Sequence, residues 1–139
     1  MNALERLLKA DAAKMTEKPK KEIEIPRLSK ILGEKFTLTV QALDTELLAE
    51  ITENNTEYTK SGKVKKANNY KIGLDMVVNA VVEPDFRDER LLKHYSAATP
   101  NDLVAKLFLA GEIGKIAEAV TELCGVDKTQ TEIDEEVKN

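Results

Sequence analysis

LFLAGEIGKIAE, residues 107–118, places two glycines and a lysine inside an apolar stretch. The stretch is compatible with a phosphate-binding loop or with a corner between two helices. A P-loop needs four residues between its first glycine and its Gly-Lys pair, then a serine or threonine, and a buried strand before it. Only two residues separate Gly111 from Gly114, and isoleucine follows the lysine. We therefore predict a corner between two helices, broken or loosened at Ala110-Gly111, because glycine is a poor helix former.

The residues on both sides of this corner predict the two helices. Thr99 is placed to cap the first helix, and Pro100 occupies its first position, where the missing N–H does no harm. The buried face of the first helix is predicted to comprise Leu103, Val104, Leu107 and Phe108. Apolar residues then continue at spacings of three and four from Ile113 to Cys124, which predicts a second helix that stops at Gly125.

Three upstream segments complete the predicted core. Residues 35–40, KFTLTV, alternate polar and apolar residues and predict a strand. Asp44 is placed to cap a helix that ends near Asn55, and its carboxylate is expected to accept N–H groups of the first turn. The apolar stripe from Tyr70 onward is wide enough to predict a buried central helix, which ends at Glu83-Pro84. Residues 54–70 are polar and lysine-rich, and are predicted to be a long surface loop.

These patterns predict a mainly α fold: a small helical domain of about five helices, with a short β-strand or hairpin near the N-terminus. We expect an N-terminal amphipathic arm and linker over residues 1–26, a helical core domain over 27–126, and an acidic, flexible tail over 127–139. The arm has a narrow leucine stripe, and two prolines and alternating Lys and Glu follow it, with a short strand at residues 22–25.

Composition limits the possible functions. The chain of 139 residues is 42% hydrophobic and 33% charged, which is typical of one water-soluble globular domain. No apolar run approaches the ~18 residues that span a bilayer, and acidic residues interrupt the N-terminal segment, so we expect a cytoplasmic protein without a signal peptide. A single cysteine excludes an internal disulfide and a cysteine-based zinc site. The net charge of -4 argues against general nucleic-acid binding.

No set of residues predicts catalysis. The one histidine, His94, and the one cysteine, Cys124, are expected to be a surface side chain and a core thiol. The acids in EPDFRDE, residues 83–89, lack the glycine and the spacing of a calcium loop, and are expected to form a solvated turn that caps the next helix. The lysine-rich loop has few aromatic residues for base stacking. We predict no catalytic, cofactor or metal site.

From Phe36 onward the sequence resembles the tail assembly chaperones of phages and phage-like elements of Gram-positive bacteria. The resemblance is carried by the order of four segments and covers about three-quarters of the chain. They are FTLTVQALDTELLAEI, VVEPDFRDERLLKHY, TPNDLVAKLFLAGEIGKIAEAVTELCG and EEVKN. The arm up to Ile25 lies outside it.

The resemblance implies a non-catalytic protein that coats the long, helical tape measure protein while tail tube subunits polymerise around it in the bacterial host cytoplasm. The partners implied are the tape measure protein and the tail tube protein, and the exposed stripe of the arm makes homo-oligomers plausible. Such a chaperone needs apolar surfaces that accept an amphipathic helix. Our candidate partner-binding residues are Leu4, Leu7, Leu8, Phe86, Leu107, Phe108 and Glu112, with core packing as the alternative for Leu107 and Phe108.

Two other functions remain as alternatives. One is a small helical regulatory or nucleic-acid-associated protein, which the lysine-rich loop would serve. The other is an enzyme that uses Glu or Asp alone, which would require a deep polar pocket around a carboxylate with a strongly shifted pKa.

Overall fold

The computed structural model describes residues 1–126, so the predicted tail at 127–139 lies outside the described residues. Eight helices take 54% of this part of the chain, and five strands in two antiparallel sheets take 16%. The fold is therefore α+β, and the prediction of a mainly α fold with one short strand or hairpin was wrong. The unpredicted strands include the hairpin within residues 56–67, which has too few apolar residues to alternate visibly, and residues 81–83, whose two valines continue the apolar pattern of the helix before them.

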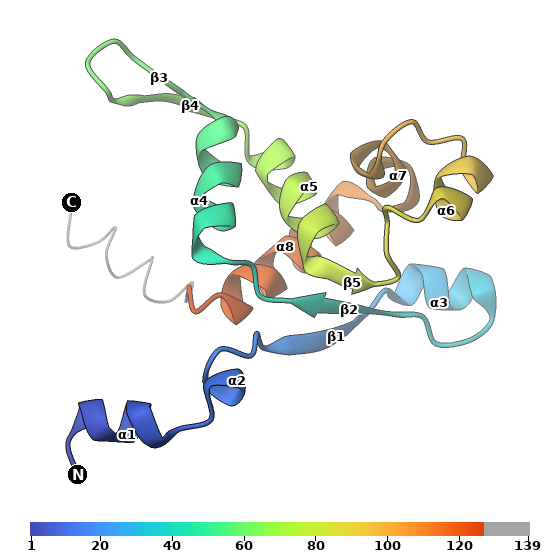
Figure 1. Ribbon diagram of the computed structural model, residues 1–139. Coiled ribbons are helices and arrows are strands. Elements are labelled where there is room, and N and C mark those ends of the chain that lie inside the picture. Colours follow the sequence, from blue (N-terminus) through green and yellow to red (C-terminus); the bar gives the residue numbers. More distant parts are fainter. Residues whose placement is uncertain (127–139) are drawn as a thin grey trace.

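The larger sheet has three strands in the order β1-β2-β5 (Figure 1). β2 (Thr37–Gln41) is central and pairs antiparallel with β1 (Lys20–Glu24) and with β5 (Val81–Glu83). The predicted alternation holds in β2, because Leu38 and Val40 are both fully buried. β1 starts before residue 26 and β2 after it, so the sheet joins residues from both sides of the predicted domain boundary.

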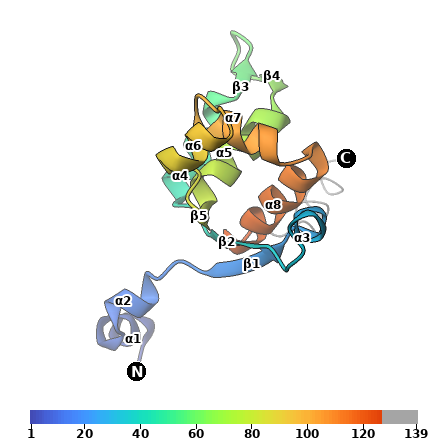
Figure 2. The ribbon, with the colours of Figure 1, turned by 90° about the vertical axis from the view of Figure 1, so that its right-hand side faces the viewer.

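Four helices form the body above this sheet: α4 (Thr45–Asn54), α5 (Asn69–Ala80), α7 (Pro100–Leu107) and α8 (Ala110–Leu123). α5 is the predicted central helix and packs against α4, α7 and α8 (Figure 2). It ends at Ala80, and the segment predicted to continue as helix to residue 83 forms β5 instead, pairing with β2. Gly73 lies on the face of α5 that meets α8, where an added Cβ would make an ordinary van der Waals contact, 3.7 Å from the Cβ of Ala117.

Several short elements lie around this body. α3 (Pro26–Leu32) follows β1, and its last turn ends at Gly33 in the left-handed conformation with φ of 78°. α6 (Glu89–His94) precedes α7. The segment predicted as a surface loop is instead a β-hairpin of β3 (Thr56–Tyr58) and β4 (Val64–Ala67), which extends past α4 (Figure 1).

One buried cluster joins the sheet and the body helices. Its fully buried large side chains are Phe86, Leu38, Leu103, Ile116, Val40, Val77, Val104 and Val120. The rings of Phe86 and Phe108 meet edge to face, with centroids 5.8 Å apart.

The corner between α7 and α8 confirms the predicted helix break. α7 begins as expected, with Thr99 Oγ1 accepting from the N–H of Asp102 at 3.1 Å. The break falls at Phe108 and Leu109, which are both extended, rather than at Ala110-Gly111. The helix break thus comes two residues before the predicted position. Phe108, at the break, is buried in the core, and Gly111 lies in the first turn of α8.

Candidate functional site

The N-terminal arm contains two short helices that bury none of their residues. α1 (Ala3–Lys9) is capped by Asn2, whose Oδ1 accepts from the N–H of Glu5 at 2.9 Å. α2 (Ala12–Met15) is capped in the same way by Asp11. Figures 1 and 2 show both helices set apart from the body of the protein.

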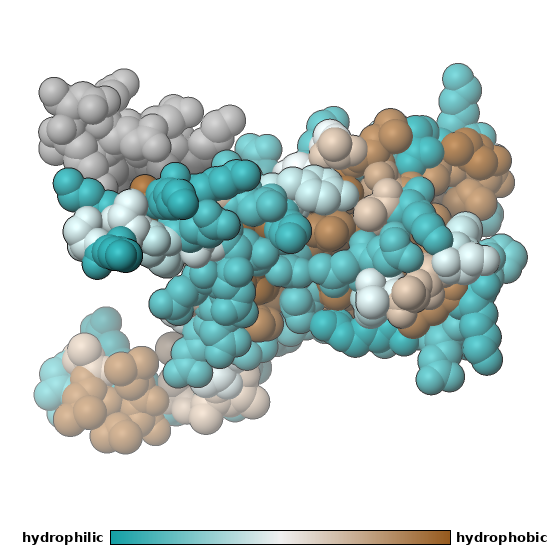
Figure 3. All heavy atoms as spheres, turned by 90° about the horizontal axis from the view of Figure 1, so that it is seen from above, coloured by the Kyte–Doolittle hydropathy of each residue, from teal (hydrophilic) through white to brown (hydrophobic). Residues whose placement is uncertain are grey.

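α1 presents a leucine face to the surroundings. Leu4 is 65% exposed, Leu7 62% and Leu8 75%. At 100° per residue the three side chains lie within one narrow arc of the helix, and Glu5, Arg6 and Lys9 lie outside it. Figure 3 shows the resulting hydrophobic cluster at the lower left, separated from the largely hydrophilic surface of the body in that view. We call Leu4, Leu7 and Leu8 the arm face.

The arm is fixed to the body where it joins β1. Lys18 Nζ lies 2.8 Å from Asp44 Oδ1, and the N–H of Ala42 donates to the carbonyl of Pro19 at 3.0 Å. Asp44 is the N-cap residue of α4, as predicted, but its carboxylate makes no capping hydrogen bond. It binds Lys18 instead, so the arm departs from a defined point at the edge of the sheet.

The remaining apolar candidates lie in or beside the core. Phe86 is 1% exposed and Phe108 4%, and they contact each other. Leu107 is half-buried and packs against the same cluster. The structure thus brings these three residues together but leaves the arm face separate from them.

Glu112 is engaged within the protein. Arg27 donates to both of its carboxylate oxygens, and the N–H of Leu109 donates to Oε1 at 2.8 Å. The hydrogen bonds from Arg27 lower the pKa of Glu112 below its usual value and outweigh the opposite effect of partial burial. Nothing in the sequence marked Arg27 as a partner of Glu112, because Arg27 lies on α3, a helix that was not predicted.

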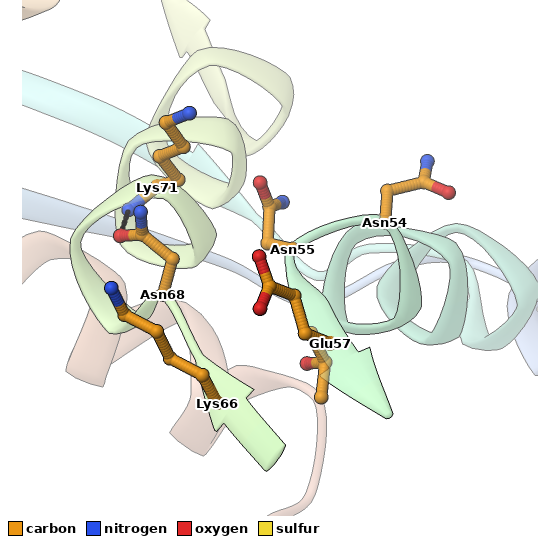
Figure 4. Close-up of a pocket in the computed structure, with 7 residues that line it drawn as sticks. Asn54, Asn55, Glu57, Lys66, Asn68 and Lys71 are labelled. Atoms are coloured by element: carbon orange, nitrogen blue, oxygen red, sulfur yellow. Dashed lines mark hydrogen bonds between the residues drawn. The ribbon is translucent and has the colours of Figure 1, made fainter. Parts of the chain in front are cut away.

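A polar depression lies at the base of the hairpin (Figure 4). It is lined by Asn54, Asn55, Thr56, Glu57, Lys66, Asn68 and Lys71. The side chains of Lys66, Asn68 and Lys71 lie together on one side of it, with Asn55 and Glu57 opposite. The depression brings together one acid, two cations and several amide or hydroxyl side chains.

The other polar clusters are engaged locally. Asp88 caps α6 and binds Arg90, whose side-chain hydrogen bonds lower the pKa of Asp88 to about 2. His94 meets the ring of Tyr95, with centroids 4.8 Å apart. Cys124 Sγ accepts from the N–H of Leu43 at 3.3 Å. Cys124 caps the end of α8 and His94 is the last residue of α6, so the two side chains lie on separate elements.

Residues 1–126 contain no group of three His, Cys, Asp or Glu side chains that could hold a metal ion. Within the same residues, no helix combines the length and the apolar character needed to cross a bilayer.

Comparison with known proteins adds three findings. A model of the family described as phage XkdN-like tail assembly chaperone protein matches residues 4–138, so the match includes the arm. The crystal structure of the protein yqbn has the same fold, with a TM-score of 0.58 at 18% sequence identity, over 85% of this chain and 98% of that chain. A search of curated proteins gave no significant match.

Proposed function

The chain belongs to the phage XkdN-like tail assembly chaperone protein family, and on this basis we propose that it binds the tape measure protein during tail tube assembly without catalysing a reaction. The proposed place of action is the cytoplasm of the bacterial host, and the tail tube protein is a second proposed partner. The observation that carries the proposal is the arm face on α1, a helix that buries none of its residues.

The size of the arm face limits how tightly one copy can bind. Full burial of one leucine contributes about 1.5–3 kcal/mol, so three leucines supply at most about 9 kcal/mol. Association costs about 4–15 kcal/mol of lost freedom, so a single arm binds weakly. A weak, reversible contact suits a chaperone that must leave its partner when the tube subunits arrive.

A long helical partner compensates for this weakness by binding many copies. An amphipathic helix repeats its apolar stripe along its length, and each repeat can take one arm. Contacts between adjacent copies would raise the effective concentration of each arm. We therefore propose that the chain coats its partner as an array, with homo-oligomerisation on the partner.

Co-expression with the tape measure protein of the same phage or prophage tests this function. The test variant replaces Leu4, Leu7 and Leu8 with glutamate, and the matched control replaces Glu5, Arg6 and Lys9 on the polar side of α1 with glutamine. We expect the original chain and the control to keep the tape measure protein soluble, and the test variant to lose that effect. If the original chain fails to keep the partner soluble, the proposal is contradicted. If the leucine-to-glutamate variant also keeps the partner soluble, the arm face is not the binding surface.

A further inference from the structure

The β3–β4 hairpin is the second feature that the body leaves uncovered. Every residue from 57 to 67 is exposed, and the hairpin extends past the end of α4 (Figure 1). A two-stranded hairpin alone is marginally stable in water, because it has no further strand or helix against which to bury one face. Its shape must therefore be held by interactions at its ends.

The base of the hairpin is tied to two body helices through Asp75. Asn55 Nδ2 donates to Asp75 Oδ2 at 2.9 Å, and Asn101 Nδ2 donates to Asp75 Oδ1 at 2.6 Å. The N–H of Asn68 donates to the carbonyl of Asn55 at 2.8 Å, next to the first residue pair of the hairpin, Thr56 and Ala67. These contacts fix the direction in which the hairpin leaves α4 and α5.

The tip is a compact turn. The N–H of Thr59 donates to the carbonyl of Lys63 at 2.7 Å, and the N–H of Gly62 donates to the carbonyl of Thr59 at 2.9 Å. Gly62 has a φ of 86°, in the left-handed region that a three-residue hairpin loop requires. The hairpin is thus ordered at both ends although it covers no part of the core.

One face of the hairpin is apolar and is surrounded by cations. Tyr58 pairs with Val64 across the strands, so the two side chains share a face, and they are 49% and 63% exposed. Residues 56–67 contain four lysines and one glutamate, a net charge of +3. Since the whole chain has a net charge of -4, the other residues together carry -7. Within residues 1–126, none of these four lysines forms an ion pair.

We propose that the Tyr58–Val64 face binds a short, acidic amphipathic helix of a protein partner. The two side chains would cover an apolar stripe, and lysines at the rim would pair with acids beside it. Strands of three and four residues span about 10–13 Å, which matches about two turns of helix. A long polyanion such as nucleic acid fits less well, because the rest of the chain carries a net charge of -7 and repels it. This surface lies outside the proposed function of the arm face.

Nuclear magnetic resonance of the full ¹⁵N-labelled chain tests the proposal. The probe is a synthetic 15-residue helical peptide with leucines on one face and glutamates on the other, and 15-residue oligothymidylate is the competing probe. We expect the peptide to shift the amide signals of residues 56–67, and added salt to weaken the binding. Replacing Val64 and Lys65 with glutamate should weaken it at least about tenfold. Lys30→Glu, an exposed lysine on α3, should leave the affinity unchanged.

Three outcomes would overturn the proposal: no shifts in the hairpin, shifts confined to the arm, or tighter binding of oligothymidylate than of the peptide at the hairpin. A second variant, Lys63→Glu with Lys65→Glu, keeps Val64. It therefore separates the loss of charge from a local effect of the Val64 substitution on the strand pairing. The titration uses no tape measure protein, so its failure would leave the co-expression result for the arm face unaffected.

Discussion

Arg27 and Glu112, 85 positions apart in the sequence, form a bidentate ion pair. Arg27 Nε lies 3.0 Å from Glu112 Oε2, and Nη2 lies 2.9 Å from Oε1. Nη2 also donates to the carbonyl of Leu107 at 2.7 Å. The pair thus ties α3 to the corner between α7 and α8, and Glu112 also receives the N–H of Leu109.

Replacing Glu112 with alanine should therefore destabilise the protein. The variant loses a helix cap and a charged hydrogen-bond pair, so we expect the free energy of unfolding to fall by about 1–2 kcal/mol. Urea unfolding measures the change. Glu118→Ala is the matched control, because Glu118 is exposed on the same helix, and it should change little. Equal effects of the two substitutions would contradict the role assigned to Glu112.

The same contacts predict how stability depends on pH. The hydrogen bonds from Arg27 lower the pKa of Glu112 from its ordinary value of 4.5, so the carboxylate contributes stability above that value. This contribution is lost as the pH falls through the lowered pKa of the folded protein. Asp88 behaves likewise between its ordinary 3.8 and about 2.

Thermal unfolding measured as the pH is lowered from 6 separates the two acids. Glu112→Gln does not titrate, so its melting temperature should fall less steeply below about pH 4.5 than that of the original chain. Parallel curves for the two proteins would show that Glu112 does not carry the effect.

The glycines of the GEIGK stretch give a direct test of its helical structure. Gly114 lies on the exposed side of α8 with nothing near an added Cβ, so Gly114→Ala should stabilise the protein by about 1 kcal/mol. Gly125 has a φ of 83° after the end of α8, so Gly125→Ala should destabilise it by about 1 kcal/mol. Chemical denaturation of both variants measures the two opposite signs. A destabilising Gly114→Ala would contradict the exposed helical position.

Core and arm positions should respond differently to truncation. Phe108 is buried against Phe86, so Phe108→Ala should cost about 3–5 kcal/mol of unfolding free energy. Leu8 is exposed, so Leu8→Ala should change the stability by less than about 0.5 kcal/mol. Denaturant unfolding of both variants provides the comparison. A large loss with Leu8→Ala would mean that the arm packs on the body in solution.

Regular apolar spacing made part of this fold predictable from the sequence. The alternation in β2, the wide stripe of α5 and the Thr99-Pro100 start of α7 each reflect burial of one face, which the residue pattern records directly. The leucine spacing of α1 likewise predicted the apolar stripe of the arm.

The missed features depend on other signals. α3 has proline at its first position and Gly33 after its end, a pattern that marks a helix even when few of its residues are buried. The hairpin has one apolar cross-strand pair, Tyr58 and Val64, which is too little for an alternation. The Arg27–Glu112 pair is a tertiary contact between distant segments, and neither residue's neighbours in the sequence indicate it.

The central claim is that the arm face contacts the tape measure protein, and site-specific photocrosslinking tests it most directly. A photoreactive phenylalanine analogue, p-benzoylphenylalanine, would replace Leu7 on α1 or, as the control, Ile31 on α3, two positions of similar exposure. In cells that express both proteins, we predict a crosslink to the tape measure protein from position 7 and none from position 31. A crosslink from position 31 alone, or from neither position while the partner stays soluble, would contradict the claim.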